Sequence, residues 1–147
     1  WRIGFAVGNK VLIKALAKIK SYVDYGAFTP VQVAGTAALN GPQDCVSEIR
    51  KTYKDRRDLL IKSFKRIGWD IPSPEASMFV WAPIPSKFKN HGSMKFSKDL
   101  MINADVAVAP GLAFGKNGEG FVRIGLVENK HRIRQAAKNI NNYFKKI

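Results

Sequence analysis

The sequence predicts an α/β chain, and three observations support this class. Short apolar stretches typical of strands recur along its 147 residues, at 1–8, 69–71, 77–82, 106–109 and 121–127. Stretches with apolar residues at helical spacing separate them, at 10–20, 31–40, 42–67, 93–103 and from 128 onward. Hydrophobic residues make up 46% of the chain, which is enough for a core and excludes a wholly disordered protein.

The first part of the chain is expected to combine one strand with two helices. Residues 1–8 predict a buried strand, and Asn9 is a plausible N-cap for the helix that follows it. Thr29 and Pro30 predict a second helix start, with the proline in the first turn, and Asn40-Gly41 predicts its end. Residues 1–41 are therefore expected to be the remnant of one lobe.

A long helix and a smaller α+β lobe are expected to follow. Residues 42–68 contain a helical pattern that is long for a small domain, so we interpret this segment as a connecting helix. Residues 69–147 alternate strands and helices and are expected to form the small lobe. Within it we expect a polar loop at 87–92, a helix capped by Ser93, and a glycine-rich turn at 115–120.

Composition limits the possible partners and location. The net charge is +14, from 25 basic and 11 acidic residues, which invites comparison with nucleic-acid or anionic-membrane binders. The aromatic residues do not alternate with the basic ones as in a base-stacking surface, so we expect no nucleic-acid partner. No apolar run reaches the roughly 20 residues of a membrane helix, so we expect no membrane partner. Cys45 is the single cysteine, which excludes an internal disulfide and favours the cytoplasm.

Few residues have the sequence context of catalytic groups. His91, His131 and Cys45 have no partners at metal-ligand or triad spacing, so we expect them to be ordinary structural or surface residues and expect no metal site. The glycine-rich stretch 115–120 matches neither the Walker pattern nor a dinucleotide fingerprint, and a strand follows it instead of a helix.

Two arginines are the exceptions, because each lies within an apolar stretch that predicts a strand. Arg2 is flanked by Trp1 and Ile3, and Arg123 lies between Val122 and Ile124. Burying a charge is costly unless an ion of opposite charge meets it, and arginine is well suited to a two-pronged grip on carboxylate or phosphate. Each arginine is therefore a candidate anion site, although either could instead point outward from a half-exposed strand.

An ordered set of motifs adds a family resemblance. The motifs are Trp1-Arg2-Ile3-Gly4-Phe5, Thr29-Pro30-x-Gln32, Ser77-Met78-Phe79-Val80-Trp81, Val106-x-Val108-x-Pro110-Gly111-x-x-Phe114-Gly115 and Gly120-Phe121-Val122-Arg123-Ile124. Together they resemble the C-terminal part of class I/II aminotransferases, the pyridoxal-phosphate (PLP) enzymes of fold type I. The branch of LL-diaminopimelate and alanine aminotransferases is the most similar. On this resemblance, residues 1–41 are a remnant of the large PLP-binding domain and 69–147 are the C-terminal small domain.

The resemblance implies roles for particular residues. Arg123 falls where the family places the arginine that binds the substrate carboxylate, and Arg2 falls where an arginine contacts the cofactor phosphate. The lysine that forms the Schiff base with PLP is expected upstream of Trp1, so this chain holds no catalytic residue and is expected to be an inactive fragment. Residues 22–28 resemble the segment that reaches the partner subunit in the family's homodimer.

The expected function is transfer of an amino group between an amino acid and a 2-oxo acid, with PLP as cofactor. Two alternatives remain open. One is a basic module that binds nucleic acid or another anion. The other is a different fold type I PLP enzyme, such as a lyase or decarboxylase, because a fold does not determine a reaction.

Overall fold

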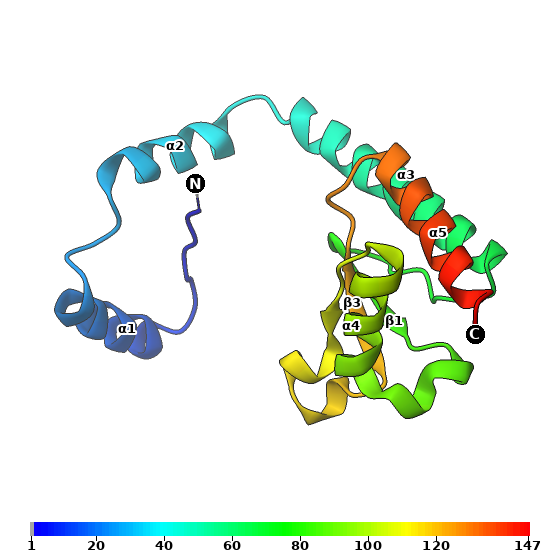
Figure 1. The fold of residues 1–147 in the computed structure, drawn as a ribbon. Helices are drawn as coiled ribbons and strands as arrows, with labels where there is room; N and C mark the ends of the chain where they lie inside the picture. The colour runs from blue at the N-terminus through cyan, green and yellow to red at the C-terminus, as the bar shows by residue number, and fades with distance from the viewer. Residues whose placement is uncertain (1) are drawn as a thin grey trace. The chain divides into compact units, whose positions relative to one another are not determined.

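The computed structural model describes residues 2–147, and the chain forms two compact units that divide between Cys45 and Val46. The first unit contains two helices, α1 (Lys10–Val23) and α2 (Thr29–Asn40), which Figure 1 draws in blue and cyan. Asn9 caps α1 as predicted, because its side-chain oxygen accepts a hydrogen bond from the Val11 amide at 2.8 Å. The predicted end of α2 is also confirmed, since Gly41 occupies its C-cap.

Residues 2–8 do not form the predicted buried strand. The segment has no regular secondary structure, and its apolar side chains are exposed, with Phe5 at 78% and Val7 at 86%. A strand requires a neighbouring strand to satisfy its backbone groups. The strands among residues 2–147 all lie in the second unit and pair with one another, so this segment has no partner in the described part of the chain.

The apolar face of α1 is uncovered within the described residues. Neither α1 nor α2 contains a buried residue, and Leu12 of α1 is 70% exposed. The apolar positions of α1 recur at helical spacing, which is the pattern of a helix that packs against another surface. Sequence periodicity therefore predicted the helix correctly, but the surface that covers it is not among these residues.

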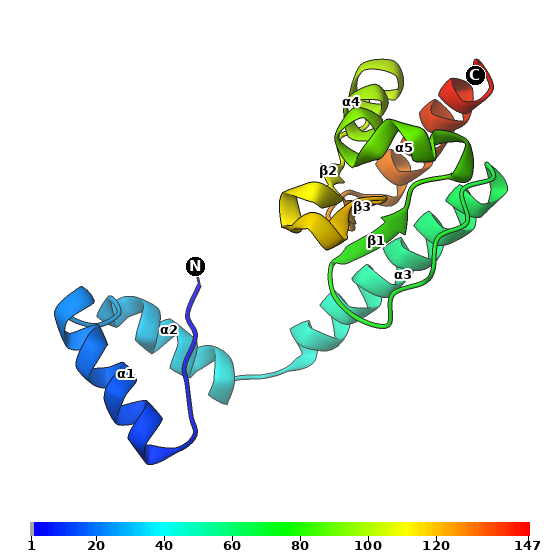
Figure 2. The ribbon, with the colours of Figure 1, turned by 90° about the horizontal axis from the view of Figure 1, so that it is seen from below.

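The second unit is an α+β arrangement built around a small sheet (Figure 2). Its helices are α3 (Asp44–Arg66, which begins two residues before the division), α4 (Gly92–Ala104) and α5 (Lys130–Phe144). Its strands are β1 (Phe79–Pro83), β2 (Ala109–Pro110) and β3 (Phe121–Gly125). Three short 3-10 helices complete it, η1 (Ser86–His91), η2 (Gly111–Phe114) and η3 (Lys116–Gly118). Helices α4 and α5 lie side by side.

The sheet is antiparallel with the order β1-β3-β2, so β3 is the central strand. Its register places Arg123 of β3 opposite Trp81 of β1 on one side and Ala109 of β2 on the other. The side chains alternate between the two faces of the sheet. Val80, Ala82, Val122 and Ile124 lie on the buried face, which leaves their neighbours on the opposite, open face.

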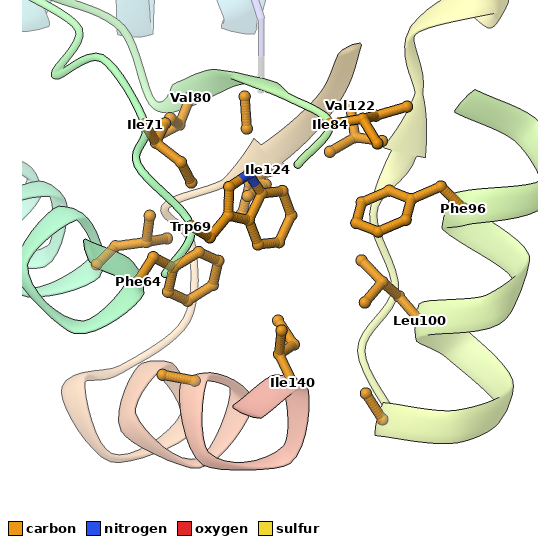
Figure 3. Packing of buried hydrophobic residues seen from close by; sticks show 14 of the residues in the cluster. Phe64, Trp69, Ile71, Val80, Ile84, Phe96, Leu100, Val122, Ile124 and Ile140 are labelled. Carbon is orange, nitrogen blue, oxygen red and sulfur yellow. The ribbon is translucent and has the colours of Figure 1, made fainter. Parts of the chain in front are cut away.

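Trp69 lies at the centre of the hydrophobic core. Its ring stacks on Phe64 of α3 at a centroid distance of 5.2 Å and meets Phe96 of α4 edge-on at 5.5 Å. Figure 3 shows Trp69 between these two rings, with Ile140 of α5 on one side and the sheet residues on the other. The indole N–H donates to the Pro83 carbonyl oxygen at 2.8 Å, so the one polar group of this side chain is satisfied. The core therefore joins all three helices to one face of the sheet.

Several predicted elements of this unit differ from the structure. The predicted strand at 69–71 is wrong, because this segment is irregular although Trp69 and Ile71 are buried. The strand predicted at 106–109 is limited to Ala109 and Pro110, and the loop predicted at 87–92 is largely the 3-10 helix η1. In each case apolar or polar composition indicated burial or exposure, but the hydrogen-bond partners decided the type of structure.

None of the helices described in residues 2–147 combines the length and the apolar character needed to cross a membrane.

Candidate functional site

The open face of the sheet carries a group of aromatic side chains around one cation. Phe79, Trp81, Phe121 and Arg123 alternate with the buried residues of β1 and β3, so they share this face. Phe114 of η2 joins them, with its ring centroid 5.7 Å from that of Trp81. Trp81 also stacks on Phe121 at 5.7 Å. We call these five residues the aromatic-arginine cluster.

Arg123 lies between two phenylalanine rings. Its guanidinium carbon is 4.2 Å from the ring centroid of Phe79 and 4.3 Å from that of Phe114. Both contacts are well within the distance at which an aromatic ring attracts a cation. The two rings contact the guanidinium carbon, and the N–H groups at the edge of the guanidinium are left to donate hydrogen bonds to a ligand.

No hydrogen bond or ion pair joins the Arg123 side chain to another group within residues 2–147. Other arginines of this unit do have such partners. Arg56 donates to the carbonyl oxygens of Leu126 and Val127, and Arg57 pairs with Asp58. Arg123 is therefore half-buried and held by aromatic contacts, with its donors unused by the described protein groups.

Phe114 lies in a loop whose two ends approach each other closely. Residues 111–118 leave the sheet and return so closely that a Cβ atom on Gly111 would lie 1.9 Å from the Gly118 carbonyl oxygen. Conversely, a Cβ on Gly118 would lie 2.1 Å from the Gly111 carbonyl oxygen. Only glycine allows two backbones to approach this closely. This Gly111–Gly118 crossing closes the loop, and Phe114 lies within it.

Ser93, at the start of α4, connects both ends of this loop. Its hydroxyl donates to Glu119 Oε2 at 2.9 Å and accepts a hydrogen bond from the Leu112 amide at 3.2 Å. Its own amide donates to Glu119 Oε1 at 2.6 Å, and the Gly120 amide donates to the same oxygen at 3.0 Å. Sequence reasoning expected Ser93 to be a helix cap, but its side chain instead binds the loop, and His91 occupies the N-cap.

Glu119 is stabilised in its charged form by these donors. The Ser93 amide, then the Gly120 amide and the Ser93 hydroxyl, hold the pKa of the Glu119 carboxyl below its ordinary value. Glu119 also lies at the first turn of α4, where backbone amides without intrahelical partners favour a negative charge. The Glu119 carboxylate thus binds the first turn of α4 and fixes the loop to this helix.

Arg2, the other predicted anion site, belongs to the first unit. It is exposed, lies in the irregular segment before α1, and has no side-chain hydrogen bond or ion pair with the described residues. The expectation that it lies inside a buried strand is wrong, for the reason given for residues 2–8. Its availability to an anion remains a prediction.

The remaining candidate side chains have structural surroundings. His91 Nδ1 lies 3.0 Å from Asp99 Oδ2, and Lys95 Nζ lies 3.0 Å from the same oxygen. Burial by itself would raise the pKa of Asp99, but the hydrogen bonds from Lys95 and His91 lower it. Cys45 and His131 are exposed. In the described range 2–147, His, Cys, Asp and Glu side chains form no group of three or more suited to a metal ion.

Sequence reasoning found Arg123 but missed the residues that surround it. Phe79 was assigned to a strand and a motif, Phe114 to a motif, Ser93 to a helix cap and Glu119 to a turn, but none of them to the surroundings of Arg123. One signal was present: Gly111 and Gly118 bracket a short segment before a strand with a central arginine. This signal indicated a turn, but not which side chains the turn places on the arginine.

Comparison with known structures agrees with this architecture. The "Substrate bound BacF structure" from Bacillus subtilis superposes with a TM-score of 0.87 and 34% identity, over 92% of this chain and 34% of that chain. A structure titled "probable N-succinyldiaminopimelate aminotransferase" from Thermus thermophilus gives a TM-score of 0.84 at 28% identity, over 93% of this chain and 36% of that chain. The fold is that of the fold type I aminotransferases.

The sequence comparisons identify the family. The family described as "Aminotransferase class I and II" matches residues 1–140, and the chain belongs to this family. A putative aminotransferase, AatC, of Rhizobium meliloti is 58% identical over 143 residues, covering 97% of this chain and 35% of the relative. The glutamate-pyruvate aminotransferase AlaC of Escherichia coli is 53% identical over 145 residues, covering 99% of this chain and 35% of the relative.

An LL-diaminopimelate aminotransferase of Natranaerobius thermophilus is 44% identical over 144 residues, which is 98% of this chain and 36% of the relative. The chain thus spans about a third of the length of these curated relatives. Class I and II aminotransferases depend on PLP, so the family membership confirms the cofactor that the motifs predicted.

Proposed function

We propose that this chain is part of a PLP-dependent aminotransferase and that Arg123 binds the α-carboxylate of its amino-acid and 2-oxo-acid substrates. The observation that supports this role most directly is the Arg123 guanidinium, which lies between Phe79 and Phe114 with no described protein acceptor. A carboxylate is planar and has two acceptor oxygens, so it matches the paired N–H groups along one edge of a guanidinium.

The aromatic contacts suit this role physically. They restrict the rotation of the long arginine side chain, so less conformational entropy is lost when a ligand binds. They also cover part of the guanidinium, and lower local water content strengthens a hydrogen bond between opposite charges. An arginine held in this way positions a substrate, which is the main contribution of a protein to a reaction whose chemistry a cofactor supplies.

We assign Arg2 as a residue of this chain that contacts the phosphate of the cofactor. It is exposed and its donors are not used by described groups, so it fits one contact to a phosphate. When bound, PLP stabilises negative charge that develops at the α-carbon of the amino acid. The Schiff-base lysine is proposed to lie upstream of Trp1. The domain assignment is also a proposal: a remnant of the large domain at 1–41, a connecting helix at 42–68 and the small domain at 69–147.

We further propose a cytoplasmic homodimer. The segment 22–28 supports the dimer because its aromatic side chains are exposed, with Tyr25 at 106% and Phe28 at 71%. The uncovered apolar face of α1 is proposed to pack against the rest of the full-length protein. Sedimentation of that protein would measure its oligomeric state, and a monomer would refute the dimer.

The carboxylate role of Arg123 can be tested in the full-length protein that contains this chain. Arg123→Ala and Arg123→Lys are compared with wild type in steady-state assays with alanine, glutamate and LL-diaminopimelate as amino donors and a 2-oxo acid as acceptor. We expect kcat/KM to fall by about 100-fold or more for Arg123→Ala with every active donor, because a charge-assisted pair to the shared carboxylate is lost. Arg123→Lys is expected to recover only part of this loss, because lysine offers no paired donors.

The same assays separate this proposal from the lyase and decarboxylase alternatives. An unchanged kcat/KM in Arg123→Ala would contradict the assigned role. Release of ammonia or carbon dioxide without amination of the 2-oxo acid would indicate a lyase or decarboxylase on the same fold.

A further inference from the structure

The loop that carries Phe114 is fixed to the second unit by side chains that do not themselves contact Arg123. Ser93 is fully buried at the start of α4, and its hydroxyl uses its hydrogen to bind Glu119 while a lone pair accepts from Leu112. Leu112 directly follows Gly111, and Glu119 directly follows Gly118. One serine therefore ties together the two chain segments that meet at the Gly111–Gly118 crossing.

The same connections set the position of Phe114. Phe114 is 48% exposed, so core packing does not hold it strongly. Its ring nevertheless lies 4.3 Å from the Arg123 guanidinium carbon, and it meets Trp81 edge-on. The backbone on both sides of Phe114 is anchored through Ser93 and Glu119, so displacement of either anchor would release the ring that covers the arginine.

We propose that Ser93 and Glu119 are positioning residues for carboxylate binding: they hold the 111–120 loop so that Phe114 covers Arg123. This inference rests on the proposed role of Arg123. It adds that the affinity for the α-carboxylate depends on two residues whose side chains bond to the loop and to α4 and not to Arg123. Glu119 acts as a carboxylate of the protein bound to a helix start, and its charge serves the loop and not the reaction.

The experiment compares two probes that differ only in a carboxylate. The first is 2-aminoisobutyrate, which has no α-hydrogen to lose and so binds without turnover. The second is tert-butylamine, which has a methyl group in place of the carboxylate and likewise has no α-hydrogen to lose. Each is titrated into the full-length, PLP-loaded enzyme, and the change in the visible cofactor band gives an apparent Kd. The ratio of the two Kd values isolates the contribution of the carboxylate.

The variants are Ser93→Ala, Glu119→Gln, Phe114→Leu and Arg123→Ala, with Glu128→Gln as the matched surface carboxylate control. We expect Ser93→Ala and Phe114→Leu to weaken 2-aminoisobutyrate binding about tenfold, while the Kd of tert-butylamine stays within about twofold of wild type. Glu119→Gln should have a smaller effect of the same kind, because glutamine keeps the shape and one acceptor oxygen but loses the charge. Glu128→Gln should match wild type.

A double variant tests whether Ser93 acts through Phe114. If it does, Ser93→Ala adds little to Phe114→Leu, whereas independent effects would multiply. Three results would each overturn the inference. The effects of the two substitutions on the Kd of 2-aminoisobutyrate could multiply, both probes could be weakened equally, or neither Ser93→Ala nor Glu119→Gln could weaken binding. Glu119 lies at the surface, so Glu119→Gln remains informative if the buried Ser93→Ala does not fold.

Arg123→Ala separates the two proposals. If this variant loses the preference for 2-aminoisobutyrate and the anchor variants do not, the inference fails while the proposed function stands. If Arg123→Ala keeps the preference, Arg123 does not bind the carboxylate, and both proposals fail.

Discussion

Substitution of Gly118 by alanine tests the Gly111–Gly118 crossing by adding a single methyl group. The new Cβ would lie 2.1 Å from the Gly111 carbonyl oxygen and 2.6 Å from its carbonyl carbon. Both atoms belong to the backbone, so no side chain can rotate away, and the two segments would have to separate by more than ~1 Å to reach ordinary contact. Gly118 is not among the residues with positive φ, so the effect is steric and not conformational.

The expected loss is at the upper end of the range for overpacking, about 2 to 3 kcal/mol in the free energy of unfolding. The separation would also strain the hydrogen bonds from Leu112 and Ser93 that anchor the loop. Urea denaturation of the full-length protein at a fixed protein concentration, followed by circular dichroism, would measure the loss. The ratio of the Kd values of the two probes would report the position of Phe114. We expect that ratio to fall toward the value of Phe114→Leu.

Gly125→Ala is the matched control on the adjoining strand. Its Cβ would meet Val127 Cγ2 at 3.6 Å, which is an ordinary contact. We expect a change within about 0.5 kcal/mol. If Gly118→Ala unfolds at the same urea concentration as Gly125→Ala and keeps the wild-type probe ratio, the crossing does not position Phe114 and the reasoning is wrong.

Two further predictions concern the core and the loop. Trp69→Phe should lower the free energy of unfolding by about 2 to 4 kcal/mol, because it leaves a void in the core and removes the donor to the Pro83 carbonyl. A loss below about 0.5 kcal/mol in urea denaturation would contradict this prediction. Glu119 should stabilise the fold above its ordinary pKa of 4.5 and lose this contribution as the pH falls through its lowered folded-state pKa. The stability difference between wild type and Glu119→Gln should therefore shrink from pH 7 to pH 3, and a constant difference would show that the charge of Glu119 has no role.

Much of the helical structure could be predicted from local sequence. Asn9 and Gly41 end their helices where their chemistry indicates, and the 3.6-residue periodicity identified α3, α4 and α5. Arg123 was recognisable as a candidate anion site because burying a charge in an apolar strand is costly unless an ion of opposite charge binds it. These features depend on neighbours within one or two helical turns, so a single sequence contains the information.

Strands and the surroundings of the site depended on tertiary contacts. Residues 2–8 and 69–71 have the composition of strands but no strand partner in the described chain, and pairing cannot be deduced from one segment alone. Ser93 and Glu119 are 26 residues apart, and each has an ordinary local explanation as a cap or a turn residue. The sequence by itself thus determined the helices, the family motifs and the arginine. The tertiary structure decided which rings and anchors surround that arginine, because those contacts form between segments distant in the chain.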